Sequence, residues 1–369
     1  MRPTTAEINL GAIARNVGLL VNHIKPATLC AVVKANGYGH GLVESARTAA
    51  DAGATMLAVA LVEEGHQLRQ AGIQTPILLL SEPPLCHFLD VVANDLTPTV
   101  YQASAIAAAN DAAVAAKTRL PVHLKIDTGM ARVGAPPHQA LNLANNIAQH
   151  KALQLAGVWS HCAVADDLTN PFTAQQIQSY QDVVAQLESA GHHGFVKHIG
   201  NSAVALAHSA GHLDMVRSGI ALYGIAPSVA MQDNLALQAA MTIRTEVAMV
   251  KNVAAGTPVS YGHHYVTPAR TQLATIPIGY ADGLPRRLGT CGGEVLIGGL
   301  RRPIAGVVTM DQTVVDCGLA QPVQASDEVI LLGKQGTETI TATEIAARLG
   351  TIAYEIVCRL SQRVPLRFK

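Results

Sequence analysis

Aromatic and charged residues are both scarce in this chain. Phe, Trp and Tyr together make up 4% of its 369 residues, and Asp, Glu, Lys and Arg make up 14%. Because 49% of the residues are hydrophobic, the core must be built from aliphatic side chains, and each tyrosine is worth locating. This composition excludes an intrinsically disordered protein, and the length predicts two domains.

Net charge, paired cysteines and long apolar runs are also absent. The 26 Lys and Arg residues equal the 26 Asp and Glu residues, so no basic excess is available to hold a nucleic-acid backbone. The six cysteines form no CxxC pair, which indicates reduced thiols in the cytoplasm rather than a disulfide framework or a zinc site. The opening MRPTTAEINL lacks the apolar run of a signal peptide, and no stretch long enough to span a membrane follows. We therefore expect a cytoplasmic protein without a metal site that binds neither nucleic acid nor a membrane.

Short apolar runs alternate with amphipathic segments over the first two thirds of the chain. Such runs are typical of strands buried on both faces, and their alternation with helices indicates parallel pairing. Eight β/α units predict a closed (β/α)₈ barrel of the TIM type, with an open doubly wound sheet as the alternative. The runs lie at residues 29–33, 56–60, 77–80, 96–100, 122–126, 153–159, 195–199 and 215–216, with helical patterns at 103–116 and 175–187.

The pattern changes after Tyr223. A polar segment beginning at Pro227 indicates a connection, and β-rich runs separated by glycine-containing turns follow. One helix is expected at Thr343–Leu349, ended by Gly350. We predict a barrel over residues 1–236, of which the first residues could pack on the second domain, and a mostly β domain over 237–369. The β runs lie at 242–250, 271–278, 294–297, 304–308, 313–315 and 329–332.

Lys34 directly follows the first apolar run. Burial of a lysine amine is costly and lowers its pKa, which makes the free amine available to form an imine. The glycine-rich loop at residues 36–41 lets the backbone approach a ligand closely. Taken alone, Lys34 could simply reach solvent. The complete string AVVKANGYGHG at residues 31–41 is much more specific than either feature.

Further polar groups follow the later apolar runs. In barrels of this kind the chemistry gathers at the C-terminal ends of the strands, so these groups predict a site on one rim. Each of them alone could instead cap a helix or meet solvent. The last two strands offer a phosphate site, because the loops after strands 7 and 8 often bind phosphate through helix N-termini. The groups are Arg132, His161, Asn201, Ser202, Arg217, Gly219 and Ile220.

The chain resembles the alanine racemases over nearly its full length. It departs from the family pattern at Cys162, where Phe is usual, and at Gly37, where Ala is common. Neither residue is a candidate catalytic group. The matching segments are residues 31–41, KIDTGMARVG at 125–134, Asn201 with Ser202, residues 217–224, VSYG at 259–262, IGYADG at 278–283, TMDQ at 309–312 and TIAYE at 351–355.

The resemblance implies a homodimeric isomerase that uses pyridoxal 5′-phosphate to interconvert L-alanine and D-alanine. Lys34 would hold the cofactor and act as the base on the D-alanine side. Tyr261 of the partner subunit would act on the L-alanine side, linked through His161 to Arg217. The cofactor contacts implied are Lys34, Tyr38, Arg132, Asn201, Ser202, Arg217, Gly219, Ile220 and Tyr354. The substrate contacts implied are Arg132, Tyr280, Met310 and Asp311, and Lys125 matches a position that can be carbamylated.

Two alternative functions remain at this point. A racemase of serine or of a broader set of amino acids is possible, because an apolar pocket rejects one added hydroxyl only weakly. A non-catalytic carrier of pyridoxal phosphate would need the barrel alone, so the motifs of the second domain argue against it. The bulky Tyr261, Tyr280 and Tyr354 favour a narrow entrance and therefore alanine. The resemblance then implies a supply of D-alanine for bacterial peptidoglycan.

Overall fold

The computed structural model describes residues 2–369 and divides the chain into two compact units. Ala12–Gln238 form the first unit, and the residues up to Gly11 form the second together with Ala239–Lys369. Over residues 2–369, no helix combines the length and the apolar character needed to cross a membrane.

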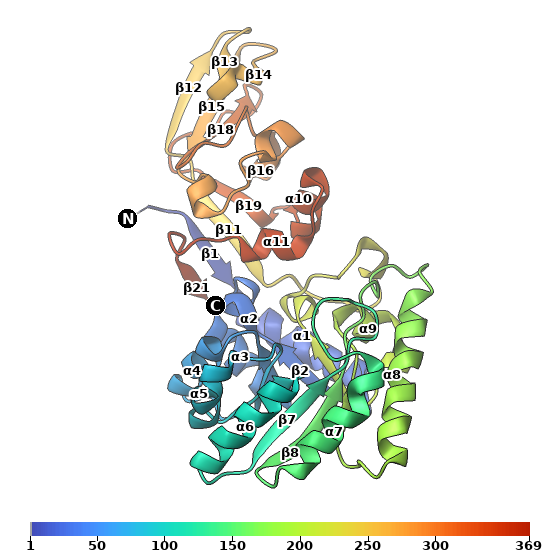
Figure 1. Cartoon of the computed structure of the whole chain (residues 1–369). Coiled ribbons are helices and arrows are strands. Elements are labelled where there is room, and N and C mark those ends of the chain that lie inside the picture. Colours follow the sequence, from blue (N-terminus) through green and yellow to red (C-terminus); the bar gives the residue numbers. More distant parts are fainter. Residues whose placement is uncertain (1) are drawn as a thin grey trace. The chain divides into compact units, whose positions relative to one another are not determined.

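The first unit is a (β/α)₈ barrel, which confirms the predicted fold class (Figure 1). Its strands are β2 (Thr28–Val32), β3 (Met56–Val59), β4 (Ile77–Leu79), β5 (Leu96–Thr97) with β6 (Thr99–Val100), β7 (Leu120–Lys125), β8 (Leu153–Trp159), β9 (Val196–His198) and β10 (Met215–Ser218). Neighbouring strands pair in parallel, and β10 pairs with β2. The N–H groups of Asp214 and Arg217 close the ring by donating to Lys197 O at 3.1 Å and Gly200 O at 3.0 Å.

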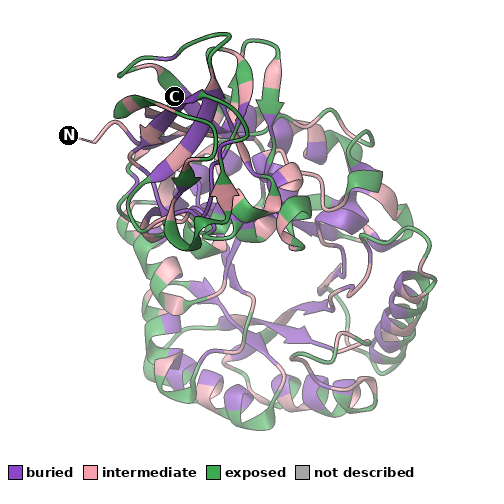
Figure 2. Cartoon of the chain, turned by 90° about the horizontal axis from the view of Figure 1, so that it is seen from above, coloured by how far each residue is buried: buried purple, intermediate pink, exposed green. Residues whose placement is uncertain are grey.

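Helices surround the ring of buried strands (Figure 2). They are α1 (Leu10–His23), α3 (Leu42–Asp51), α4 (Val62–Gln70), α5 (Phe88–Ala93), α6 (Ala103–Ala115), α7 (Ala140–Gln149), α8 (Phe172–Ser189) and α9 (Ser202–Ala207). The predicted apolar runs fall on the strands in order, and the run 153–159 matches β8 residue for residue. The run 96–100 is divided between β5 and β6 at Pro98, which has no N–H to donate to a ladder.

The second unit is built on two antiparallel-rich sheets and one hairpin. The larger sheet has the order β17 (Leu300–Pro303), β16 (Glu294–Ile297), β19 (Glu328–Gln335), β11 (Met241–Glu246), β1 (Thr5–Ile8) and β21 (Leu366–Phe368), with β20 (Glu338–Ile340) on β19. The smaller sheet is β12 (Met249–Val253), β15 (Thr271–Ile276) and β18 (Thr313–Gly318), and β13 (Pro258–Val259) pairs with β14 (Tyr265–Val266). β1 joins this unit by pairing antiparallel with β11 and parallel with β21.

Three details of the second unit differ from the expected pattern. The run 242–250 is not one strand, because it is divided between β11 and β12. The run 304–308 forms only a single bridge, at Ile304, since Gly306 with φ +81° leaves the extended conformation. The short helix α11 (Ala353–Cys358) was not predicted. The expected helix is α10 (Ala342–Leu349), and Gly350 ends it with φ +69°.

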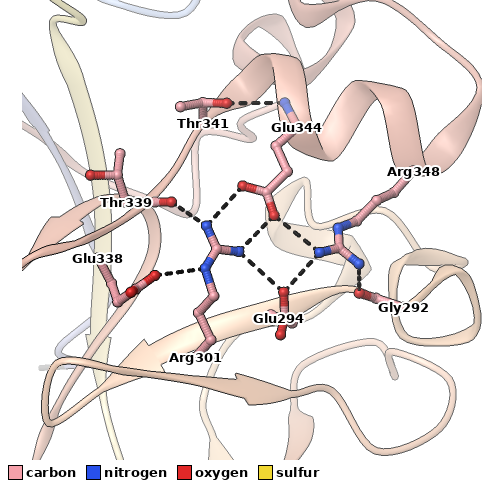
Figure 3. A network of polar contacts seen from close by, with 8 residues as sticks. All are labelled: Gly292, Glu294, Arg301, Glu338, Thr339, Thr341, Glu344 and Arg348. Atoms are coloured by element: carbon pink, nitrogen blue, oxygen red, sulfur yellow. Dashed lines mark hydrogen bonds and ion pairs between the residues drawn. The ribbon is translucent and has the colours of Figure 1, made fainter.

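Two arginines and three glutamates tie α10 to the larger sheet (Figure 3). Arg301 contacts Glu294 at 3.1 Å, Glu338 at 2.8 Å and Glu344 at 2.7 Å, and Arg348 contacts Glu294 at 2.7 Å and Glu344 at 3.1 Å. The hydrogen bond from Arg301 holds the pKa of the Glu344 carboxyl below its ordinary value. All five side chains remain partly exposed, so each ion pair adds little stability. Together the pairs attach α10 to β16, β17 and β20.

We expect Glu344→Gln to lower the free energy of unfolding by about 0.5–1 kcal/mol at pH 7. Because the folded pKa of Glu344 is depressed, its contribution is complete above the unfolded pKa and disappears as the pH falls through the folded value. Urea unfolding of both proteins at pH 7 and near pH 3 measures this difference. A difference of the same size at both pH values would contradict the assignment.

Candidate active site

The guanidinium of Arg217, on β10, lies buried inside the barrel and is 3% exposed. Its Nη1 donates to His198 Nδ1 at 2.9 Å and to His198 O at 3.1 Å. Its Nη2 donates to Ser160 O at 2.7 Å, to Ile199 O at 3.1 Å and to His161 Nδ1 at 3.2 Å. The Trp159 ring covers the guanidinium at 4.4 Å. Within residues 2–369, the hydrogen-bond partners of Arg217 are carbonyl oxygens and imidazole nitrogens, and no carboxylate is among them. Burial lowers the pKa of the Arg217 guanidinium to about 10.

Arg217 fixes the tautomers of the histidines around it. An arginine only donates, so Nδ1 of His161 and Nδ1 of His198 must both be unprotonated acceptors. His198 then carries its proton on Nε2, which lies 3.0 Å from His123 Nδ1. Burial and the charge of Arg217 hold the pKa of both His161 and His198 well below the ordinary value, so both rings are neutral at pH 7. His161 is left with its hydrogen on Nε2.

Lys34 begins a turn with the opposite hand to an α-helix. In α2 (Lys34–Tyr38) the φ angles of Ala35, Asn36 and Tyr38 are all +53°, and that of Gly37 is +61°. Each non-glycine residue in this conformation costs about 1–2 kcal/mol, so the turn persists only if its surroundings hold it. The backbone closes it through Gly37 N–H to Val33 O at 2.8 Å and Gly41 N–H to Asn36 O at 2.9 Å.

Two side chains outside the turn hold it in place. Glu64 at the start of α4 accepts the Ala35 N–H at 2.6 Å. The ring of His40 contacts Tyr38 O at 2.9 Å and Gly37 O at 3.2 Å through Nδ1. A carbonyl only accepts, so His40 Nδ1 carries the hydrogen, and burial lowers the pKa of this ring to about 4. Lys34 thus starts from a backbone that is strained but firmly held.

Several cations gather around Lys125 at the end of β7. Its Nζ lies 4.2 Å from the centre of the Trp159 ring, and the residue is 3% exposed. Burial lowers its pKa to about 7, with further lowering by the charges of Arg217, Arg132 and Lys34. After burial, the charges of Arg217, Lys125, Arg132 and Lys34 also lower the pKa of His161, whose Nδ1 lies 3.2 Å from Arg217. Such a concentration of positive charge fits an anionic ligand.

Arg132 is exposed on a loop that Asp127 organises. The Asp127 Oδ1 accepts three successive N–H groups, from Gly129 at 2.9 Å, Met130 at 2.9 Å and Ala131 at 3.1 Å. This is the turn chemistry expected of an aspartate at the head of a loop. The sequence DTGMAR therefore folds into a rigid support that presents Arg132 to solvent at the rim.

The predicted phosphate-binding residues come together after β9 and β10. The Gly219 N–H donates to Ser202 Oγ at 2.9 Å, and Ser202 Oγ lies 3.2 Å from Ser218 Oγ. The hydroxyl of Tyr38 packs directly on Gly219, which leaves no room for a side chain there, and Ile220 follows at once. The Asn201 side chain instead caps α9, accepting from Ala203 N–H at 3.1 Å and Val204 N–H at 3.0 Å.

The remaining predicted residues belong to the second unit. Tyr261 is 70% exposed, Met310 is 53% exposed and Tyr280 is 40% exposed. Asp311 pairs with Arg363 at 2.7 Å, and Tyr354 lies on α11. Exposure this large is unusual for such side chains and fits surfaces that meet a ligand or a second subunit.

Sequence reasoning missed four side chains that hold the site: His123, His198, Glu64 and His40. His123 lies within the apolar run of β7, where a pattern treats it as core. Its ring fits because Gly157 faces it across a β-bulge and has no side chain. His198 is the last residue of β9 and lies within the seventh run, and its position before Gly200 and Asn201 was the one available signal.

Comparison with known proteins places this geometry in a family. Residues 8–227 match the model described as "Alanine racemase, N-terminal domain", and residues 240–368 match "Alanine racemase, C-terminal domain". Because the second match covers the β-rich unit, a carrier built from the barrel alone is not supported. The alanine racemase of Symbiobacterium thermophilum is 44% identical over 365 residues, which cover 99% of this chain and 97% of that protein.

Solved structures agree with the sequence relatives. The alanine racemase from D-cycloserine producing Streptomyces lavendulae is 40% identical with a TM-score of 0.95, over 100% of this chain and 97% of that one. A histidine racemase from Leuconostoc mesenteroides is 27% identical with a TM-score of 0.90, over 100% of this chain and 98% of that one. With both domain models matched and relatives near 40% identity over the full length, the chain belongs to the alanine racemase family.

Proposed function

We propose that this protein racemises alanine with pyridoxal 5′-phosphate bound at Lys34. The observation that carries the proposal is the buried Arg217, bonded to His161 Nδ1 at 3.2 Å at one end of the barrel, where the charges of Lys125, Arg132 and Lys34 also lower the pKa of His161. Pyridoxal phosphate brings a phosphate, a phenolic oxygen and an aldehyde. This site offers hydroxyls and backbone N–H groups for the phosphate, the cation Arg132 for the phenolic oxygen, and the Lys34 amine for the aldehyde.

The residues after β9 and β10 fit a phosphate. Ser202 Oγ, the backbone around Gly219 and Ile220, and the Tyr38 hydroxyl would hold it, with Tyr354 adding a further hydroxyl. Asn201 would support this set by capping α9. Arg217 would face the ring nitrogen of the cofactor, and Arg132 its phenolic oxygen. When bound, pyridoxal phosphate makes the α-hydrogen acidic by delocalising the electron pair left on Cα.

Two bases on opposite faces would move the α-hydrogen. Lys34 would serve the D-alanine face, and Tyr261 of the partner subunit in a homodimer would serve the L-alanine face. A tyrosine has an ordinary pKa of about 10, so a phenolate needs stabilisation. His161 has its Nδ1 occupied by Arg217, so its Nε2–H is available to the Tyr261 oxygen. That hydrogen bond and the charge behind it would favour the phenolate.

Arg217 would also decide which reaction follows. A guanidinium keeps its proton at neutral pH, even with the lowered pKa of about 10. It would therefore not transfer a proton to the ring nitrogen, which limits electron withdrawal into the ring. Proton return to Cα is then favoured over loss of the amino group to the cofactor.

Substrate recognition would use the barrel of one subunit and the β-rich unit of its partner. Arg132 and the Met310 backbone of the partner subunit would hold the carboxylate, with Tyr280 and Asp311 beside the side chain. Lys125, whose pKa is lowered to about 7, has a neutral amine fraction that can add carbon dioxide, and the resulting carbamate would steady Arg132. The reaction would supply D-alanine for peptidoglycan from the cytoplasm.

A chiral assay with each alanine enantiomer tests the function directly. The protein should convert both, and borohydride should fix the cofactor on the Lys34 peptide, as seen by mass spectrometry. Lys34→Ala should lose this fixation and more than about 10³-fold in racemisation rate. Lys151→Ala, which removes an exposed lysine before β8, should change neither.

The same assay with serine and histidine distinguishes the substrate alternatives. Turnover of either amino acid at a higher kcat/KM than alanine would replace alanine as the substrate. A protein that binds the cofactor at Lys34 and turns over none of them would overturn the enzymatic proposal.

The two-base assignment predicts an asymmetric loss in Tyr261→Phe. In D₂O, deuterium uptake into L-alanine should fall by about 10²–10⁴-fold, while uptake into D-alanine should fall far less because Lys34 remains. Mass spectrometry of the recovered alanine measures both. Tyr265→Phe is the matched control in the same segment, since the Tyr265 hydroxyl is bonded to Asp316 at 2.6 Å. Equal losses from both enantiomers in Tyr261→Phe would break the assignment.

A further inference from the structure

A fully buried carboxylate lies behind the exposed Tyr280 in the second unit. Asp282 is 0% exposed, and its Oδ2 accepts the Gly279 N–H at 2.9 Å and Arg2 Nη1 at 2.9 Å. Its Oδ1 lies 3.3 Å from Nε of Arg363. Burying a carboxylate costs free energy unless the group is paired, and here two arginines pair with it. Such an arrangement indicates that the position of the surrounding backbone matters.

The turn around Asp282 is joined to the loop that carries Met310. The Tyr280 N–H donates to Thr309 O at 2.9 Å, and the Ala281 N–H donates to Met310 O at 3.1 Å. Gly279 packs so closely on the carbonyls of Thr309 and Met310 that no side chain fits there. The two segments are therefore held together by backbone hydrogen bonds and close packing.

Arg363 links the same two segments from outside. While its Nε faces Asp282, its Nη2 donates to Asp311 Oδ1 at 2.7 Å. Arg2 is bound in turn, through Nη2 to Arg363 O at 3.0 Å. Arg2 thus contacts Asp282, which is 280 positions away along the chain, and Arg363, which is 361 positions away.

We propose that Asp282, Arg2 and Arg363 are positioning residues that set the spacing between Tyr280 and Met310 for substrate. The inference rests on the proposed function, in which those two residues meet alanine. Tyr280 and Met310 point outward, 40% and 53% exposed, whereas the carboxylate that anchors them is buried. A fixed spacing accepts a methyl side chain and excludes larger ones. A small shift at such a position weakens substrate binding without touching the proton-transfer groups.

Arg363→Gln tests the proposal, because this side chain is half exposed and its loss spares the fold. We expect the KM for alanine to rise about 5- to 30-fold, as for the loss of one charged hydrogen bond, with kcat changed less than about threefold. The ratio of serine to alanine turnover should rise as well. Arg363→Lys keeps the charge beside Asp282 but lacks the fork that reaches Asp311, so its KM should be intermediate.

Controls separate this effect from damage elsewhere. Arg367→Gln removes an exposed guanidinium from β21 of the same C-terminal segment and should leave KM and the serine ratio unchanged. Absorbance of the bound cofactor should be the same in all variants, since Lys34 is untouched. Asp282→Asn should also raise the KM for alanine. If this substitution of a buried residue prevents folding, Arg363→Gln alone tests the proposal.

The outcomes distinguish the two proposals. If the wild-type enzyme racemises alanine and Arg363→Gln keeps the wild-type KM and the wild-type ratio of serine to alanine turnover, this inference alone is overturned. A fall in kcat at constant KM, or altered cofactor absorbance, also overturns it. A wild-type protein that does not racemise alanine overturns the proposed function and this inference with it.

Discussion

A buried positive charge with neutral partners organises the barrel end of this protein. Arg217 is bonded to three carbonyl oxygens and two imidazole nitrogens. Its charge is therefore not cancelled locally, and it adds to burial, the larger cause, in lowering the pKa of His161, His198 and Lys125. Burial together with this charge leaves the histidines neutral and Lys125 partly neutral, and donation by Arg217 sets the tautomers of His161 and His198. Placing a cation among neutral acceptors costs stability, which the Trp159 ring and five hydrogen bonds offset in part.

The backbone next to Lys34 is strained. Three non-glycine residues of α2 are left-handed, and Glu64 and His40 hold them from neighbouring elements. Strain of this kind persists where the surrounding structure over-determines the geometry. It fixes the backbone from which the Lys34 side chain extends. It also places the Tyr38 hydroxyl against Gly219, which follows β10, the last strand of the barrel. The turn thereby connects the amine to the phosphate-binding residues.

Much of the fold and the rim residues could be predicted from the sequence. Eight apolar runs indicate the strands, because the pattern of apolar residues that marks a buried strand is local in the sequence. Lys34, His161 and Arg217 lie at or near the ends of strands. Non-local features could not be predicted. His123 meets His198 from 75 positions away, Arg2 meets Asp282 from 280 positions away, and β1 pairs with β11 and β21. Ala35 carries no signal for a left-handed turn and Asn36 carries only a weak one, since glycine is the residue that strongly favours this conformation.

The protonation of the histidines around Arg217 tests the central claim most directly. In protein labelled with ¹⁵N histidine, imidazole nitrogen shifts report which ring nitrogen carries hydrogen. The account predicts that His161 and His198, assigned through His161→Gln and His198→Gln, each carry one hydrogen, on Nε2, throughout pH 6–9. A second hydrogen on either ring within that range, or a hydrogen on Nδ1, would contradict it, because Arg217 could then no longer donate to that ring.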